Sequence, residues 1–250
     1  MNHFAFQQFR GEVMFRFIGR KAAAVAFALA AAAPLGASAV PIELALVLDA
    51  SGSINSTEWN LQRNAYANAV QAVLPTDGTV AVSVIRFATT ATVVRDLTVI
   101  DSATELDALS SFFAALSQTG NGSNTCISCG IFEATGTFTG TADRSIVDVS
   151  TDGVWNTGVD PAGPAGTVGT AAWAVANAAD VVNAIGIGVT PDFAAGPGAF
   201  NTFADDFAAF QAALTAKLRR EVVGVPAPGV LALLGIGLFA IGAMQRRRSH

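Results

Sequence analysis

An apolar run that ends in a short polar segment constrains the fold of this chain more than any other feature. Residues 42–48 are rich in Leu, Val and Ile, and Asp49, Ser51 and Ser53 follow directly. The run is too short for a typical helix, and its nearly continuous hydrophobicity is typical of a parallel strand covered on both faces. In sheets of such strands, ligands bind at the carboxyl ends. We therefore expect a buried central strand that leads directly into a ligand site.

The polar segment offers only oxygen atoms as ligands. Asp49, Ser51 and Ser53 are spaced so that one tight loop, eased by Gly52, directs three side chains toward a single point. Hard oxygen donors of this kind hold Mg²⁺ in proteins. The alternative is that these residues merely cap the next helix, because Asp and Ser are favoured at N-caps and in turns.

The pattern D-x-S-x-S resembles the metal-ion-dependent adhesion site (MIDAS) of von Willebrand factor A (VWA) domains. In that family a Thr and an Asp from two later loops complete the metal shell. The matching residues here are Thr125, in a turn-like segment before a predicted helix, and Asp152, in a T-D-G sequence after a second apolar strand. The three matches follow the family's order and lie within residues 41–221, most of which the resemblance covers.

The resemblance also implies a role for each residue of the site. Ser51, Ser53 and Thr125 would coordinate Mg²⁺ or Mn²⁺ directly, whereas Asp49 and Asp152 would act largely through water. Neutral hydroxyl ligands leave the ion electrophilic, so an acidic side chain of a protein partner could complete the octahedron. The predicted function is an exported, divalent-metal-dependent protein-binding or adhesion module that is not an enzyme. The alternative is a structural extracellular-matrix component whose metal only stabilises the loops.

Predicted strands and helices alternate along the rest of the chain. This order indicates an α/β fold with a doubly wound, mainly parallel central sheet flanked by helices. It agrees with the Rossmann-like VWA fold that the resemblance implies. The predicted strands after the first cover residues 80–87, 92–97, 145–150 and 184–189, and the predicted helices cover residues 57–73, 102–116, 128–135, 171–182 and 200–220.

The two ends of the chain have the composition of processing segments. Basic residues precede the Ala-rich run 22–33, and Ala37-Ser38-Ala39 follows it, so residues 1–39 are predicted to be a signal peptide. A transmembrane anchor is the rival interpretation, but about a dozen apolar residues are short for a bilayer span. The predicted VWA domain then covers residues 40–224.

Residues 225–250 contain a proline-rich break, an apolar segment from Val230 to Met244, and the cluster Arg246-Arg247-Arg248. This order resembles a PEP-CTERM sorting signal, with Ala227 where that family usually has Glu. The resemblance implies transient membrane insertion and removal of the tail by an exosortase-type protease. The protein would be membrane-anchored before cleavage and at the cell surface or extracellular after it. The alternative is an ordinary C-terminal anchor held by the arginines.

The chain has two cysteines, Cys126 and Cys129, close to the proposed metal residue Thr125. Export to an oxidising compartment predicts a disulfide between them. The alternatives are a pair of free or packed thiols, or the C-x-x-C site of a thiol oxidoreductase near a helix N-terminus. The latter is disfavoured because the pair does not follow the first strand of the fold.

Charge and composition exclude several classes of function. The chain carries a formal net charge of −5, and half of its basic residues, but only Glu12 among the acidic ones, lie outside residues 40–225. The predicted domain is therefore strongly acidic and should not bind nucleic acid. His3 and His250, the two histidines of the chain, lie in the terminal segments. After processing, a Ser-His-Asp triad would be impossible.

Overall fold

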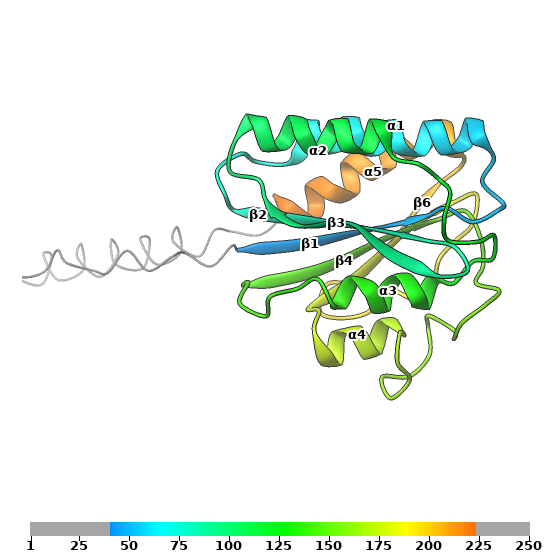
Figure 1. The fold of residues 1–250 in the computed structure, drawn as a ribbon. Coiled ribbons are helices and arrows are strands. Elements are labelled where there is room, and N and C mark those ends of the chain that lie inside the picture. Colours follow the sequence, from blue (N-terminus) through cyan, green and yellow to red (C-terminus); the bar gives the residue numbers. More distant parts are fainter. Residues whose placement is uncertain (1–40, 224–250) are drawn as a thin grey trace, which may run out of the picture. The chain divides into compact units, whose positions relative to one another are not determined.

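The computed structural model describes residues 41–223, which form a six-stranded sheet with helices on both faces (Figure 1). The elements in chain order are β1 (Ile42–Asp49), α1 (Ser56–Val73), β2 (Val80–Phe87), β3 (Ala91–Val99), α2 (Ala103–Ala115), α3 (Ile127–Thr135), β4 (Arg144–Thr151), α4 (Ala171–Asn177), β5 (Val181–Ile187), β6 (Asn201–Ala204) and α5 (Phe207–Val222). The predicted α/β class is confirmed.

The strand order is β3-β2-β1-β4-β5-β6, and only β3, at one edge, is antiparallel to its neighbour. The first strand of the chain thus lies at the centre. The chain winds outward through β2 and β3, then returns to β4 on the other side of β1. The order therefore reverses between β1 and β4, and the crevice at such a switch point is where doubly wound sheets bind ligands. Asp49 ends β1 at this crevice.

Two apolar cores cover the two faces of the sheet. Helices α1, α2 and α5 lie on one face, and α3 and α4 lie on the other (Figure 1). Leu44, Leu46 and Leu48 of β1 belong to the first core, whereas Ala45 and Val47 belong to the second. Every residue of β1 is buried. Its continuous hydrophobicity is thus explained by burial on both faces, as the sequence predicts.

Helix α1 begins where the sequence predicts it. The Asn55 side chain accepts hydrogen bonds from the backbone N–H groups of Thr57 and Glu58, and the Glu58 carboxylate accepts one from Asn55 N. This reciprocal arrangement is a capping box. Because the cap starts α1 a few residues after Ser53, the loop between β1 and α1, which carries Ser51 and Ser53, is short.

The boundary between α4 and β5 differs from the prediction. The predicted helix 171–182 ends at Asn177, and the next strand begins at Val181 instead of Ala184. Asp180 accepts a hydrogen bond from the backbone of Ser145, and Val181 pairs with Ile146 of β4. Sheet pairing thus overrides the helical preference of this Ala-rich segment.

The segment before the last helix also differs from the prediction. Asn201–Ala204 forms strand β6 at the sheet edge, and α5 begins only at Phe207, with Asp206 as its N-cap. Phe203 would lie in step with Phe207 and Phe210 on the predicted helix 200–220 and is expected to be buried with them, but it is 47% exposed. The spacing of the phenylalanines imitates a helical period in a segment that pairs with β5 instead.

Two predicted segments, residues 1–39 and 225–250, lie outside the described residues. Within residues 41–223, no helix has the length and hydrophobicity needed to cross a membrane.

Candidate metal-binding site

The first loop of the site follows β1 and presents one carboxylate and two hydroxyls. Asp49 is fully buried, and its Oδ1 accepts a hydrogen bond from Ser51 N at 2.8 Å. The hydroxyls of Ser51 and Ser53 lie 3.0 Å apart. The Gln62 side chain of α1 donates to the backbone carbonyl of Asp49 at 2.8 Å, which ties the end of β1 to that helix.

The third loop follows β4 and brings a second carboxylate to the same point. Ser53 Oγ donates to Asp152 Oδ1 at 2.8 Å, although the two residues are far apart in the sequence. Thr151, the last residue of β4, donates from its hydroxyl to Asp49 Oδ2 at 2.6 Å. The structure therefore brings Asp49, Ser51, Ser53 and Asp152 together at the carboxyl ends of β1 and β4.

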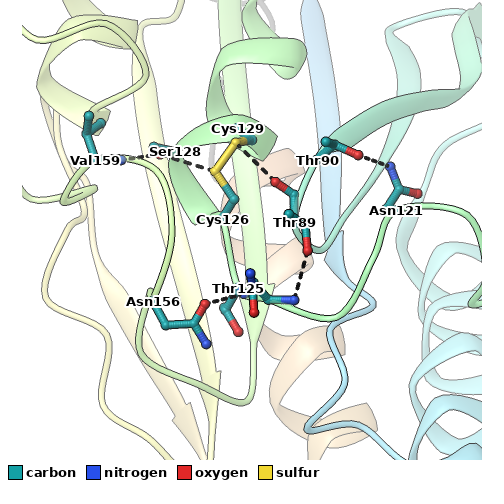
Figure 2. The surroundings of a disulfide bond; sticks show 10 residues. Thr89, Thr90, Asn121, Thr125, Cys126, Ser128, Cys129, Asn156 and Val159 are labelled. Atoms are coloured by element: carbon teal, nitrogen blue, oxygen red, sulfur yellow. Dashed lines mark hydrogen bonds between the residues drawn. A yellow bond between two sulfur atoms is a disulfide. The ribbon is translucent and has the colours of Figure 1, made fainter.

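The second loop places Thr125 beside the third loop. Thr125 N donates to Asn156 Oδ1 at 2.8 Å (Figure 2), and Asn156 N donates back to Thr125 O at 3.1 Å. The same loop contacts the first loop, because Gly52 N donates to Ser123 O at 2.9 Å. A methyl group added to Gly153 would lie 3.8 Å from Thr125 Oγ1. All five predicted metal residues thus belong to three loops that contact one another.

A disulfide joins Cys126 and Cys129 directly after Thr125 (Figure 2). It spans the start of α3, where Cys126 is the N-cap and makes no side-chain capping hydrogen bond. Cys126 N donates to Ala88 O at the end of β2, and Cys126 is buried. The disulfide therefore joins the end of the second loop to the first turn of α3, and the backbone hydrogen bond joins it to the residue after β2.

Burial and charge repulsion make the two carboxyl groups receptive to a cation. Burial raises the pKa of Asp49 to about 6, against the hydrogen bonds from Ser51 and Thr151 that lower it, and the charge of Asp152 raises it further. Burial also raises the pKa of Asp152. A divalent ion between the two would offset both costs by favouring the charged forms.

The chemistry of these residues fits a hard divalent ion. Every side chain in the site offers oxygen, and hydroxyls and carboxylates suit Mg²⁺ or Mn²⁺. Within residues 41–223, no three His, Cys, Asp or Glu side chains gather to hold a metal. The candidate site instead pairs two carboxylates with three hydroxyls. The ion would keep residual positive charge at its open side if the hydroxyls bound it directly and the carboxylates acted through water.

Two supporting residues were not predicted from the sequence. Thr151 bonds to Asp49, and Asn156 bonds to both backbone polar groups of Thr125. The position of Thr151 next to Asp152 in a T-D-G sequence is a signal that could have identified it. Asn156 lies in a loop rich in turn residues, and no spacing rule distinguishes it there.

The family comparison agrees with the extent of the folded region. Residues 39–226 match the family model "Protein of unknown function (DUF1194)". The chain belongs to the DUF1194 family. No curated protein sequence matches this DUF1194 chain.

Solved structures show that this DUF1194 chain has a VWA fold. Proximal thread matrix protein 1 from the mussel byssus aligns with a TM-score of 0.55 and 18% identity over 74% of this chain and 48% of that one. A von Willebrand factor type A protein from Catenulispora acidiphila aligns with a TM-score of 0.55 and 16% identity over 74% and 43%. The pilus adhesin SpaC from Lactobacillus rhamnosus GG aligns with a TM-score of 0.55 and 16% identity, over 74% of this chain and 31% of SpaC. This chain thus spans at most about half the length of these proteins.

Proposed function

We propose that this protein is an exported module that binds a protein partner through a divalent cation held by Asp49, Ser51, Ser53, Thr125 and Asp152. The observation that carries the proposal is the contact between the first and third loops, in which Ser53 Oγ lies 2.8 Å from Asp152 Oδ1 at the switch point of the sheet. The mussel thread protein, which has the same fold, has been solved with a zinc-occupied MIDAS motif. This supports a cation at the equivalent place here.

The partner would supply an acidic side chain. Ser53 is exposed and Asp152 is half-buried, so the ion would face solvent on this side. Exposed apolar side chains flank the third loop: Val154 is 73% exposed and Trp155 is 37% exposed. An acidic residue set among apolar neighbours would match this surface, because the carboxylate would bind the ion and the apolar groups would bury Val154 and Trp155.

Two alternatives predict different behaviour. A matrix component with a stabilising metal is favoured by the similarity to the mussel protein, which is a thread matrix protein. A thiol oxidoreductase would have to exchange its disulfide through Cys129, which is partly exposed, because Cys126 is 1% exposed. This class is disfavoured because the pair does not follow the first strand of the fold. We propose no catalytic role for this chain.

A retention experiment separates adhesion from a matrix role. The purified full chain is immobilised and incubated with cell-surface proteins in Mg²⁺ or in EDTA, with Asp49→Asn as the matched variant. We expect a protein that is retained only by the wild-type chain in Mg²⁺ and that loses binding when its contacting Asp or Glu becomes Asn or Gln. If the metal raises Tm but retention is the same in EDTA, the protein has the matrix role instead.

The proposal includes export and removal of the tail, based on the sequence of residues 1–39 and 225–250. Mass spectrometry of the protein recovered from the cell surface or medium should show a chain that begins near Val40 and lacks Arg246 to Arg248. An intact C-terminus on that protein would establish a plain anchor instead.

A further inference from the structure

A buried amine lies between two buried carboxyl groups on the face of the sheet covered by α5. The Nζ atom of Lys217, on α5, lies 2.6 Å from Asp148 Oδ2 of β4 and 2.7 Å from Glu221 Oε1 of α5, and all three side chains have zero solvent exposure. Asn183 of β5 donates to the same Glu221 oxygen at 2.8 Å. Lys217 is the only lysine that follows Lys21 in the whole chain. The cluster lies apart from the cation site and is not used by it.

The contact between Lys217 and Asp148 differs from an ordinary buried ion pair. Lys217 donates a well-directed hydrogen bond to Glu221, but its 2.6 Å contact with Asp148 Oδ2 lacks hydrogen-bond geometry. Within residues 41–223, neither oxygen of Asp148 has a hydrogen-bond partner. A carboxylate buried without hydrogen bonds is costly, so the ionised form of this cluster is poorly stabilised.

We propose that Lys217 and Asp148 condense into an intramolecular isopeptide bond, with Glu221 carrying the protons. The nitrogen atom that would form the bond already touches the carboxyl group that would receive it, in a site without solvent. The proposal goes beyond the cation-dependent function and does not require a metal. The new bond would join the last helix of the domain to a central strand.

The protonation state of Glu221 suits this reaction, whereas Lys217 must first give up a proton. Burial and the charge of Asp148 raise the pKa of Glu221 to about 8, against the opposing effect of Lys217, so Glu221 keeps its proton at neutral pH. Burial lowers the pKa of Lys217, but the neighbouring acidic groups, Asp148 first, outweigh burial and raise it, so the amine rests in its charged form. The reactive amine would have to arise by proton transfer from Lys217 to Asp148, which converts a buried ion pair into two neutral groups.

The steps balance without an oxidant or a co-reactant. The neutral Nζ attacks Cγ of protonated Asp148, and the carboxyl proton of Glu221 moves to the oxygen that becomes the leaving hydroxyl. Glu221 takes a proton from the nitrogen as the C–O bond breaks, so that one amide and one water molecule form. Fixed proximity of the amine and the carboxyl group speeds the condensation, because effective molarities of well-oriented intramolecular reactions reach about 10⁵–10⁸ M.

Mass spectrometry of the wild-type chain tests the proposal without any variant. The denatured and reduced full chain should be lighter than its sequence mass by one water molecule. A succinimide at Asp152-Gly153 would give the same loss of mass, so a chymotryptic digest is needed to distinguish it from the isopeptide bond. Chymotrypsin cuts at Trp155, Trp173 and Phe210, which lie between Asp148 and Lys217 in the sequence. We expect one joined pair of peptides containing Asp148 and Lys217. Full sequence mass and two separate peptides from folded wild-type protein would overturn the proposal.

Variants test the role of Glu221. Glu221→Gln keeps the shape of the side chain but removes the exchangeable carboxyl proton, so formation of the joined peptides should slow by about 10²-fold or more. Arg219→Gln, on an exposed position of the same helix, should react like the wild type. Lys217→Met should give no joined peptides. If folded Glu221→Gln forms the bond as fast as the wild type, Glu221 carries no proton in the reaction.

Discussion

The Thr151 hydroxyl donates a hydrogen bond to Asp49 Oδ2 at 2.6 Å and thereby joins the carboxyl ends of β4 and β1. The backbone N–H of Ser51 donates to the other carboxylate oxygen, Oδ1, at 2.8 Å. Both oxygens of this fully buried carboxyl group therefore have a donor. The central carboxylate of the proposed cation site is thus held by two strands that are adjacent in space and distant in the sequence.

Replacing Thr151 by Val should loosen this carboxylate. The variant keeps the volume but removes a hydrogen bond to a buried charged group, so the free energy of unfolding should fall by roughly 1–3 kcal/mol. Urea denaturation at neutral pH measures the change. Thr215→Val is the matched control, because its hydroxyl bonds within the exposed turn of α5 and should matter by less than about 0.5 kcal/mol. Equal losses in both variants would contradict the role given to Thr151.

The raised pKa of Asp49 predicts opposite pH dependences for stability and for cation binding. Burial raises this pKa from its usual 3.8 to about 6, so the folded state binds the proton more tightly than the unfolded state. Without metal, the resulting stability is full below about pH 3.8 and is lost as the pH rises through about 6. Cation affinity should rise over the same range, because the ion binds the ionised form.

Denaturation of chelator-treated protein between pH 5 and pH 7.5 measures the pH dependence of the metal-free stability. Titration with Mn²⁺ over the same range measures the pH dependence of cation affinity. Asp49→Asn removes the titrating group, so the fall in metal-free stability around pH 6 should be smaller in this variant than in the wild type. An identical stability profile for the variant and the wild type would show that Asp49 does not titrate there.

The central part of the fold and the first loop of the proposed site carry signals that are local in the sequence, whereas Thr125 and Asp152 were named through the resemblance to VWA domains. Strand β1 is apolar along its whole length since both faces are covered, and the capping box of Asn55 and Glu58 marks the start of α1. The D-x-S-x-S pattern places three oxygen-bearing side chains in one loop. Short-range periodicity and turn chemistry are sufficient for these inferences.

The remaining features depend on contacts between distant segments. Residues 181–183 form a strand because β4 provides a partner, and residues 201–204 form one because they pair with β5. Spacing alone cannot distinguish an edge strand rich in Phe from a helical stripe. The burial of Lys217 was also unforeseen, since a lysine near the end of a helix is ordinarily solvated.

Asn156 should support the second loop without contacting the cation. Its side chain accepts a hydrogen bond from the N–H of Thr125, so Asn156→Ala would remove that bond, keep the backbone bond from Asn156 N to Thr125 O, and lower Mn²⁺ affinity by about tenfold. Titration calorimetry measures the affinity. Asn60→Ala, at an exposed position of α1, is the control and should leave it unchanged. An unaltered affinity in Asn156→Ala would remove this residue from the site.

The disulfide should matter more for the cation than for the fold. It closes a very small loop, for which chain entropy predicts roughly 2 kcal/mol of stabilisation, but it fixes the backbone next to Thr125. In the Cys126→Ser/Cys129→Ser variant, Tm without metal should fall by only a few degrees, whereas Mn²⁺ affinity should fall by about tenfold or more. A large loss of Tm with unchanged Mn²⁺ affinity would show that the disulfide stabilises the fold and does not support the cation site. Thiol labelling of non-reduced wild-type protein, native and denatured, checks that the bond is present.

Titration calorimetry of the purified full chain with Mg²⁺ and Mn²⁺ tests the proposed cation site most directly. We expect one saturable site per chain, lost in Asp49→Ala and weakened to a smaller degree in Thr125→Ala, because water can replace a neutral hydroxyl. Thr215→Val should bind as the wild type does. Absence of saturable binding by the folded wild-type chain, or an Asp49→Ala affinity equal to that of the wild type, would contradict a cation site at these residues.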